Sequence, residues 1–188
     1  MRTPRLSFLL LTSLLAGSLG IARASRETPS PSTPQRQLHI QVEIPSASLR
    51  TYVDSAYDVV YGRCVGTGFD ATATPWPCTV YRFEALRNSR GIVLGPIDVR
   101  VVGGANADIA VRCAKSPTLE IGQEYVLFLT ENPDNPSYGI LGLKDGTYRV
   151  NDEGQVSGLH AGQGEPVDRF LTRVSSIMID TKETKEAK

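Results

Sequence analysis

The first regular pattern of apolar positions along the chain lies in residues 46–56 (SASLRTYVDSA). Apolar residues recur there at intervals of three and four, which places them on one face of a helix: Leu49, Tyr52, Val53 and Ala56. Pro45 and Ser46 mark a start for this short helix.

The period then changes to two. Alternating apolar and polar residues predict strands over residues 57–65, 78–86 and 96–102. Residues 66–77 are rich in glycine and proline and predict a turn or loop between the first two strands. Residues 107–113 (ADIAVRC) read as a continuation of the third strand after a bend.

A different pattern follows in residues 124–130 (EYVLFLT), which are almost continuously apolar. Such a run is typical of a strand buried on both faces. Shorter strands are predicted over 138–143, 147–150 and 155–159, with Gly-containing turns between them.

The last element is a helix over residues 166–179, whose apolar residues form one stripe that packs against a sheet. Five to seven short strands with a helix at either end predict a mainly β fold, namely a closed or nearly closed antiparallel barrel. A β-sandwich is the competing architecture.

The N-terminus has the pattern of a secretory signal peptide over residues 1–24. Arg2 and Arg5 precede an apolar run over 6–19, and the small residues of Ala22-Arg23-Ala24 predict cleavage after Ala24. The alternative is an uncleaved anchor, but the run is shorter than the roughly 20 residues that a spanning helix needs. We therefore expect an exported protein, whether secreted, periplasmic or attached to the cell surface, with no stable membrane insertion after signal removal.

Composition divides the remainder of the chain. Residues 25–44 begin with a stretch rich in Pro, Ser and Thr and predict a disordered or extended linker. The barrel and its flanking helices occupy 45–180, and residues 181–188 (TKETKEAK) read as a charged, frayed tail.

Charge excludes one class of partner. The whole chain has 20 basic and 20 acidic residues, and signal removal takes away three arginines and no acid. The exported form then carries a net charge of about −3, whereas nucleic-acid binding calls for a basic face.

Three cysteines remain after the signal peptide: Cys64, Cys78 and Cys113. In an oxidising compartment two of them are expected to pair. We favour Cys64 with Cys78, because they end one predicted strand and begin the next and would face one another across a hairpin. A bridge involving Cys113 is the alternative.

No pattern of chemistry-bearing residues indicates a catalytic, metal or cofactor site. His39, His160 and the cysteines lack metal-ligand spacing, and no G-x-S-x-G elbow is present. Asp58, Glu84 and Asp98 lie in predicted strands, where outward polar positions explain them. We expect no catalytic residue, no metal and no cofactor.

Several segments resemble secreted bacterial proteins similar to tissue inhibitors of metalloproteinases. They are residues 55–63 (SAYDVVYGR), 81–86 (YRFEAL) with Gly91, 121–129 (IGQEYVLFL) and 146–150 (GTYRV) through Gly154. The resemblance covers roughly residues 46–160. It implies a netrin-like variant of the five-stranded OB barrel, flanked by helices.

The chain departs from that family at its inhibitory group. The inhibitors chelate the protease zinc through a cysteine at the mature N-terminus, whereas here the expected mature chain starts at Ser25-Arg26 and has no cysteine before Cys64. The leading hypothesis is therefore a secreted, non-catalytic module that presents residues 66–77, 103–108 and 131–137 to a protein partner. The alternatives are a protease inhibitor that acts without zinc chelation and a hydrolase whose residues follow no known motif.

Overall fold

The computed structural model describes residues 35–45, 47–133 and 136–186. The predicted signal peptide, its cleavage point after Ala24 and the first part of the predicted linker lie outside the described residues. No helix in the described part of the chain is both long enough and apolar enough to cross a membrane.

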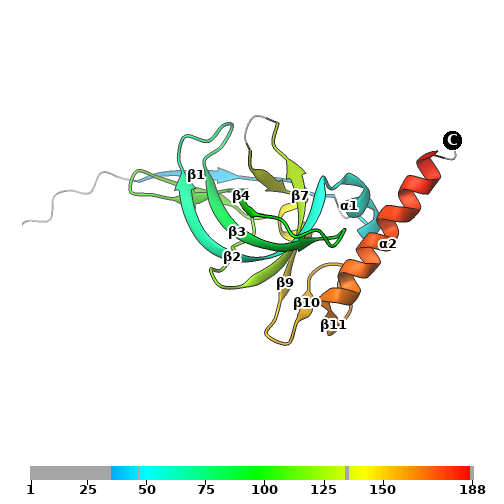
Figure 1. Ribbon diagram of the computed structural model, residues 1–188. Coiled ribbons are helices and arrows are strands. Elements are labelled where there is room, and N and C mark those ends of the chain that lie inside the picture. The colour runs from blue at the N-terminus through cyan, green and yellow to red at the C-terminus, as the bar shows by residue number, and fades with distance from the viewer. Residues whose placement is uncertain (1–34, 46, 134–135, 187–188) are drawn as a thin grey trace, which may run out of the picture. The chain divides into compact units, whose positions relative to one another are not determined.

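The centre of the fold is a closed five-stranded barrel (Figure 1). Its strands are β2 (Asp58–Asp70), β3 (Cys78–Asn88), β4 (Pro96–Val102), β7 (Glu124–Glu131) and β8 (Tyr138–Ile140). Neighbours pair in the order β7-β2-β3-β4-β8, and a further β7–β8 pairing closes the circle. All pairs are antiparallel except the parallel β4–β8 pair. The expected mainly β, OB-like barrel with helices before and after it is confirmed.

An extension of the barrel sheet carries the C-terminal helix. After the 3₁₀ turn Leu143–Gly146, β9 (Thr147–Val150) pairs with the first half of β7. Strands β10 (Gln155–Ser157) and β11 (Glu165–Pro166) continue the sheet outward and lead into α2 (Val167–Glu186).

A second, smaller sheet has the order β1-β6-β5. Strand β1 (Arg36–Ile40) runs parallel to β6 (Ile109–Cys113), and β5 (Gly104–Ala105) pairs with the other side of β6. The predicted linker is therefore wrong for residues 36–40. Leu38 and Ile40 alternate with polar residues, and they are half-buried at this edge.

Helix α1 (Leu49–Ser55) is shorter than predicted. It begins after Ser48 because the Ser48 hydroxyl accepts a hydrogen bond from the Thr51 amide at 3.2 Å. Its apolar face packs on the barrel with α2, as the spacing of Leu49, Tyr52 and Val53 predicted.

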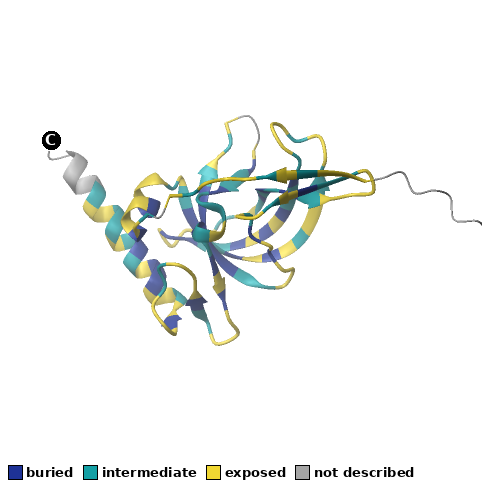
Figure 2. Cartoon of the chain, turned by 180° about the vertical axis from the view of Figure 1, so that it is seen from behind, coloured by how far each residue is buried: buried dark blue, intermediate teal, exposed yellow. Residues whose placement is uncertain are grey.

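The apolar side chains form two clusters on either side of the β2–β7 wall. Figure 2 shows the buried positions in dark blue along the barrel strands and on α2. The barrel interior contains Val60, Phe83, Val99 and Leu127, each at most 1% exposed. The second cluster lies between the outside of the barrel and the two helices, around Phe128, Tyr148, Phe170 and Val174. Strand β7 contributes to both clusters, which confirms the prediction from its continuous apolar run.

Several boundaries differ from the predicted ones. Strand β2 continues to Asp70, so part of the expected 66–77 loop is strand. Within the segment 107–113, residues 109–113 form a strand of the small sheet and do not continue β4. Helix α2 continues to Glu186, so the predicted frayed tail is helical over most of its length, because its Lys and Glu residues favour helix.

Candidate binding cleft beside the barrel

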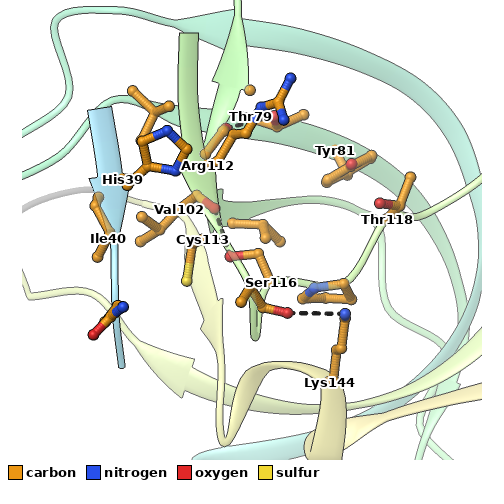
Figure 3. Close-up of a pocket in the computed structure, with 17 residues that line it drawn as sticks. His39, Ile40, Thr79, Tyr81, Val102, Arg112, Cys113, Ser116, Thr118 and Lys144 are labelled. Atoms are coloured by element: carbon orange, nitrogen blue, oxygen red, sulfur yellow. Dashed lines mark hydrogen bonds between the residues drawn. The ribbon is translucent and has the colours of Figure 1, made fainter. Parts of the chain in front are cut away.

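A cleft lies between the small sheet and one end of the barrel, where Tyr81 and Val101 of the interior cluster line it (Figure 3). Its volume is about 720 Å³, within the range of natural ligand sites. One side is formed by the end of β1 and by β6, and the other by β3, the end of β4 and the loop over residues 114–118. Lys144, from the 3₁₀ turn, lies at one end.

Side-chain bonds to the main chain hold the walls of the cleft in place. Ser116 Oγ donates to the Val102 carbonyl at 2.5 Å, and Thr79 Oγ1 donates to the Gly103 carbonyl at 2.7 Å. Lys144 Nζ donates to the Ala114 carbonyl at 2.9 Å. These bonds fix the loop after β6 to the barrel and to the 3₁₀ turn. The walls of the cleft are therefore held in a defined arrangement by the fold.

Gly103 allows the close approach of β4 to β6. Its φ is +110°, and a Cβ there would lie 3.1 Å from the Val111 carbonyl oxygen. Any other residue would strain the backbone and push the two strands apart.

The cleft has a basic lining. Lys144 contributes a cation at one end and Arg112 another at the rim, and no aspartate or glutamate is among the described residues that line the cleft. Neither cation forms an ion pair within the described part of the chain. A ligand with a carboxylate would therefore find complementary charge here.

Cys113 lines the same cleft and is half-buried. Cys64 and Cys78 are buried, and all three cysteines are free thiols in this structure. Burial raises the pKa of Cys64 and also that of Cys78, so both are held in the thiol form.

The geometric argument for a Cys64–Cys78 disulfide is wrong. In the β2–β3 register, Cys64 lies opposite Phe83, whereas Cys78 lies opposite Asp70. Five residues of β3 therefore separate the two cysteines, roughly 16 Å along the strand. A disulfide needs Cα atoms within about 7 Å of each other. The prediction failed because it assumed a long loop where β2 and β3 continue to pair.

Cys78 belongs instead to a polar group at the far end of the hairpin. Arg100 Nη1 contacts Asp70 Oδ2 at 2.9 Å and Cys78 Sγ at 3.6 Å. Hydrogen bonds from Thr72 and then from Arg100 lower the pKa of Asp70. Sequence alone did not reveal this group, because its members are distant along the chain and join only through the strand register.

The two histidines lie apart. His39 is on β1, at the rim of the cleft. His160 Nε2 lies 2.8 Å from the Ala47 carbonyl, and its Nδ1 lies 2.7 Å from the Tyr148 hydroxyl. A carbonyl can only accept, so Nε2 donates to Ala47, and the tautomer that this bond selects leaves Nδ1 as the acceptor for the Tyr148 hydroxyl. His160 therefore has a structural role that links the β10–β11 loop to the segment before α1.

The carboxylates singled out in the sequence occupy separate positions. Asp58 accepts hydrogen bonds from the Val59 amide at 2.8 Å and from Asn88 at 3.1 Å. Asp98 pairs with Arg82 at 3.1 Å on the surface, and Glu84 is exposed. The described residues contain no group of three or more Asp, Glu, His or Cys side chains that could hold a metal ion.

A further polar group that the sequence did not indicate surrounds Glu124. This carboxylate accepts hydrogen bonds from the Tyr61 hydroxyl and from Arg63, the latter at 2.6 Å. The bond from Tyr61, followed by that from Arg63, lowers the pKa of Glu124. Burial and the bond to Glu124 raise the pKa of Tyr61 to about 12.

The three predicted partner-binding segments have different structures. Residues 66–70 belong to β2, and residues 71–77 form a turn in which Trp76 is half-exposed. Residues 103–108 include β5 and approach the cleft through Gly103 and Gly104. Residues 131–137 join β7 to β8, and residues 134–135 among them are not described.

No protein-family model matches the chain, and no curated protein matches it significantly. The candidate site is therefore defined by its geometry alone.

Proposed function

We propose that this chain is an exported, non-catalytic protein-binding module of the netrin-like OB type. The observation that carries the proposal is the position of the open space. The barrel interior is filled by apolar side chains such as Phe83 and Val99, which are fully buried. An opening lies at one end of the barrel, between its mouth and the small sheet, where Tyr81 and Val101 form part of its wall. The barrel then acts as a rigid support that positions a binding cleft.

The resemblance to tissue inhibitors of metalloproteinases supports this proposal only for the fold of the barrel and its flanking helices. The closed five-stranded topology and the flanking helices agree with it. Zinc chelation is not carried over, because no cysteine precedes Cys64 in the expected mature chain.

The cleft suits a protein partner better than a small apolar ligand. Its walls combine strand main chain, hydroxyl groups and two cations with a few apolar side chains such as Ile40 and Val111. This mixture matches the polar character of non-obligate protein interfaces.

Affinity capture from the exported fraction of the source organism tests the proposal. The full chain is used as bait beside two variants, Thr118→Arg, which fills the cleft from an exposed wall position, and Thr172→Arg, which makes the same change on the exposed side of α2. We expect one partner to be retained by the unmodified chain and by Thr172→Arg, and to be lost with Thr118→Arg.

Two results would refute the proposal. Capture of no partner would remove the binding function, and equal capture by both variants would remove the cleft as its site. The non-catalytic part is tested separately with generic ester, glycoside and peptide substrates. Turnover of any of these substrates that co-purifies with the folded protein would contradict the non-catalytic part of the proposal.

A further inference from the structure

The described residues contain three strands at sheet edges, and only one of these edges is long and unprotected. Strands β5 and β11 are two residues each, and β11 ends in Pro166. Strand β1 has five residues, a continuous register with β6, and no proline or lysine. Natural proteins usually protect exposed edges with proline, lysine or a β-bulge. Strand β1 has none of these, so its open edge is unusual in this molecule.

The register shows which main-chain groups are available on this edge. The Arg36 amide donates to the Asp108 carbonyl on the β6 side at 2.9 Å. Amides alternate in direction along a strand, so Leu38 and Ile40 also face β6. The N–H and C=O groups of Gln37 and His39 therefore point outward, and no described strand pairs with them.

The side chains of the small sheet differ between its two faces. Val111 is buried toward the barrel, and its partner Leu38 is on the same face. His39 and its partner Arg112 are exposed on the opposite face. A strand added beside β1 would continue this alternation, with apolar side chains toward the barrel and acidic side chains next to His39. These acidic side chains would lie on the same face as Arg112, which is one strand further in on β6.

We propose that the free edge of β1 receives an extended segment of the protein partner, which adds a fourth strand to the small sheet. The segment alternates apolar and acidic residues. This inference deepens the proposed function and rests on it. Main-chain hydrogen bonds to Gln37 and His39 supply affinity, and the alternation supplies specificity, as in other cases of strand addition.

The test uses a short synthetic peptide that alternates valine and glutamate, with a second peptide that has lysine in place of glutamate. Binding to the full chain is measured by fluorescence anisotropy, and amide hydrogen exchange locates the contact. The decisive variant is Gln37→Pro, which removes one outward donor and leaves the bonds between β1 and β6 intact, because proline is tolerated on a solvent-facing edge. Gln37→Ala is the matched control.

We expect the glutamate peptide to protect the amides of Gln37 and His39 from exchange. Gln37→Pro is expected to weaken its binding about tenfold, and Gln37→Ala by less than about twofold. Arg112→Ala is expected to reduce the preference for the glutamate peptide over the lysine peptide.

Other outcomes separate this inference from the proposed function. Equal binding by Gln37→Pro and Gln37→Ala, protection elsewhere, or protection of β1 only through self-association of the chain would each overturn it. If the exported partner is captured equally by the unmodified chain and by Gln37→Pro, the edge proposal fails while the binding function stands. If no partner is captured at all, the proposed function itself fails.

Discussion

The link between Tyr148 and His160 offers a sharp test of how the barrel is joined to its helices. Tyr148 is fully buried, and its hydroxyl lies 2.7 Å from His160 Nδ1. Its ring is held by Phe128 and Phe170, with ring centroids at 5.5 and 4.8 Å. The variant Tyr148→Phe therefore keeps the packing and removes one hydrogen bond.

The expected loss follows from the groups left behind. Removal of the hydroxyl deletes one hydrogen bond and leaves a half-buried acceptor on His160 without its partner. Together these effects should lower the free energy of unfolding by about 1–3 kcal/mol. Burial raises the pKa of Tyr148 well above its ordinary value, so the group lost at neutral pH is a neutral hydroxyl.

Urea denaturation followed by circular dichroism measures this loss, with the midpoint and slope compared between variants. Tyr57→Phe is the matched control, since it makes the same chemical change at a ring that is 52% exposed. The control should change stability by less than about 0.5 kcal/mol. If Tyr148→Phe is as stable as Tyr57→Phe, the His160 link does not stabilise the fold and our reasoning is refuted.

Three further predictions concern the barrel and its thiols. Phe83→Ala, in the filled interior, should cost about 3–5 kcal/mol in urea denaturation; a loss below about 1 kcal/mol would contradict the packed interior. Because the pKa of Glu124 is lowered from 4.5 on folding, its stabilisation is present above that pH and is lost as the pH falls. Glu124→Gln should therefore flatten the acid side of the stability profile, and an unchanged profile would argue against the bond from Tyr61. Alkylation of the native protein, read by mass spectrometry, should modify Cys113 before Cys64, and the reverse order would show that the burial assigned to Cys64 is wrong.

The sequence allowed the barrel to be predicted because its strands have strong local patterns. The continuous apolar run of β7 indicated burial on both faces, and Val126 and Leu127 indeed face different clusters. The stripe on α2 likewise predicted its packing through Phe170 and Val174. In these elements, burial follows directly from periodicity.

The cleft could not be predicted in the same way. Its walls combine β1 with β6, which are about seventy residues apart in the chain, as Arg36 and Ile109 show. Strand β1 has only two apolar positions, too few to distinguish it from an extended linker. The same limit applied to the cysteines, because the length of the β2–β3 pairing depends on cross-strand contacts and is not encoded in the spacing of Cys64 and Cys78.

The short pairing between β4 and β8 has a consequence for the dynamics of the barrel. The β4–β8 pairing, the shortest in the barrel, involves only Val99 with Tyr138 and Arg100 with Gly139, whereas β2 and β3 pair over nearly their full length. A seam of two residue pairs is the weakest point of the cylinder, so local opening should begin there. Thermal fluctuations would then part the wall between β4 and β8 while the long β2–β3 hairpin stays intact, and the amides of β8 would exchange with solvent ahead of those in the hairpin.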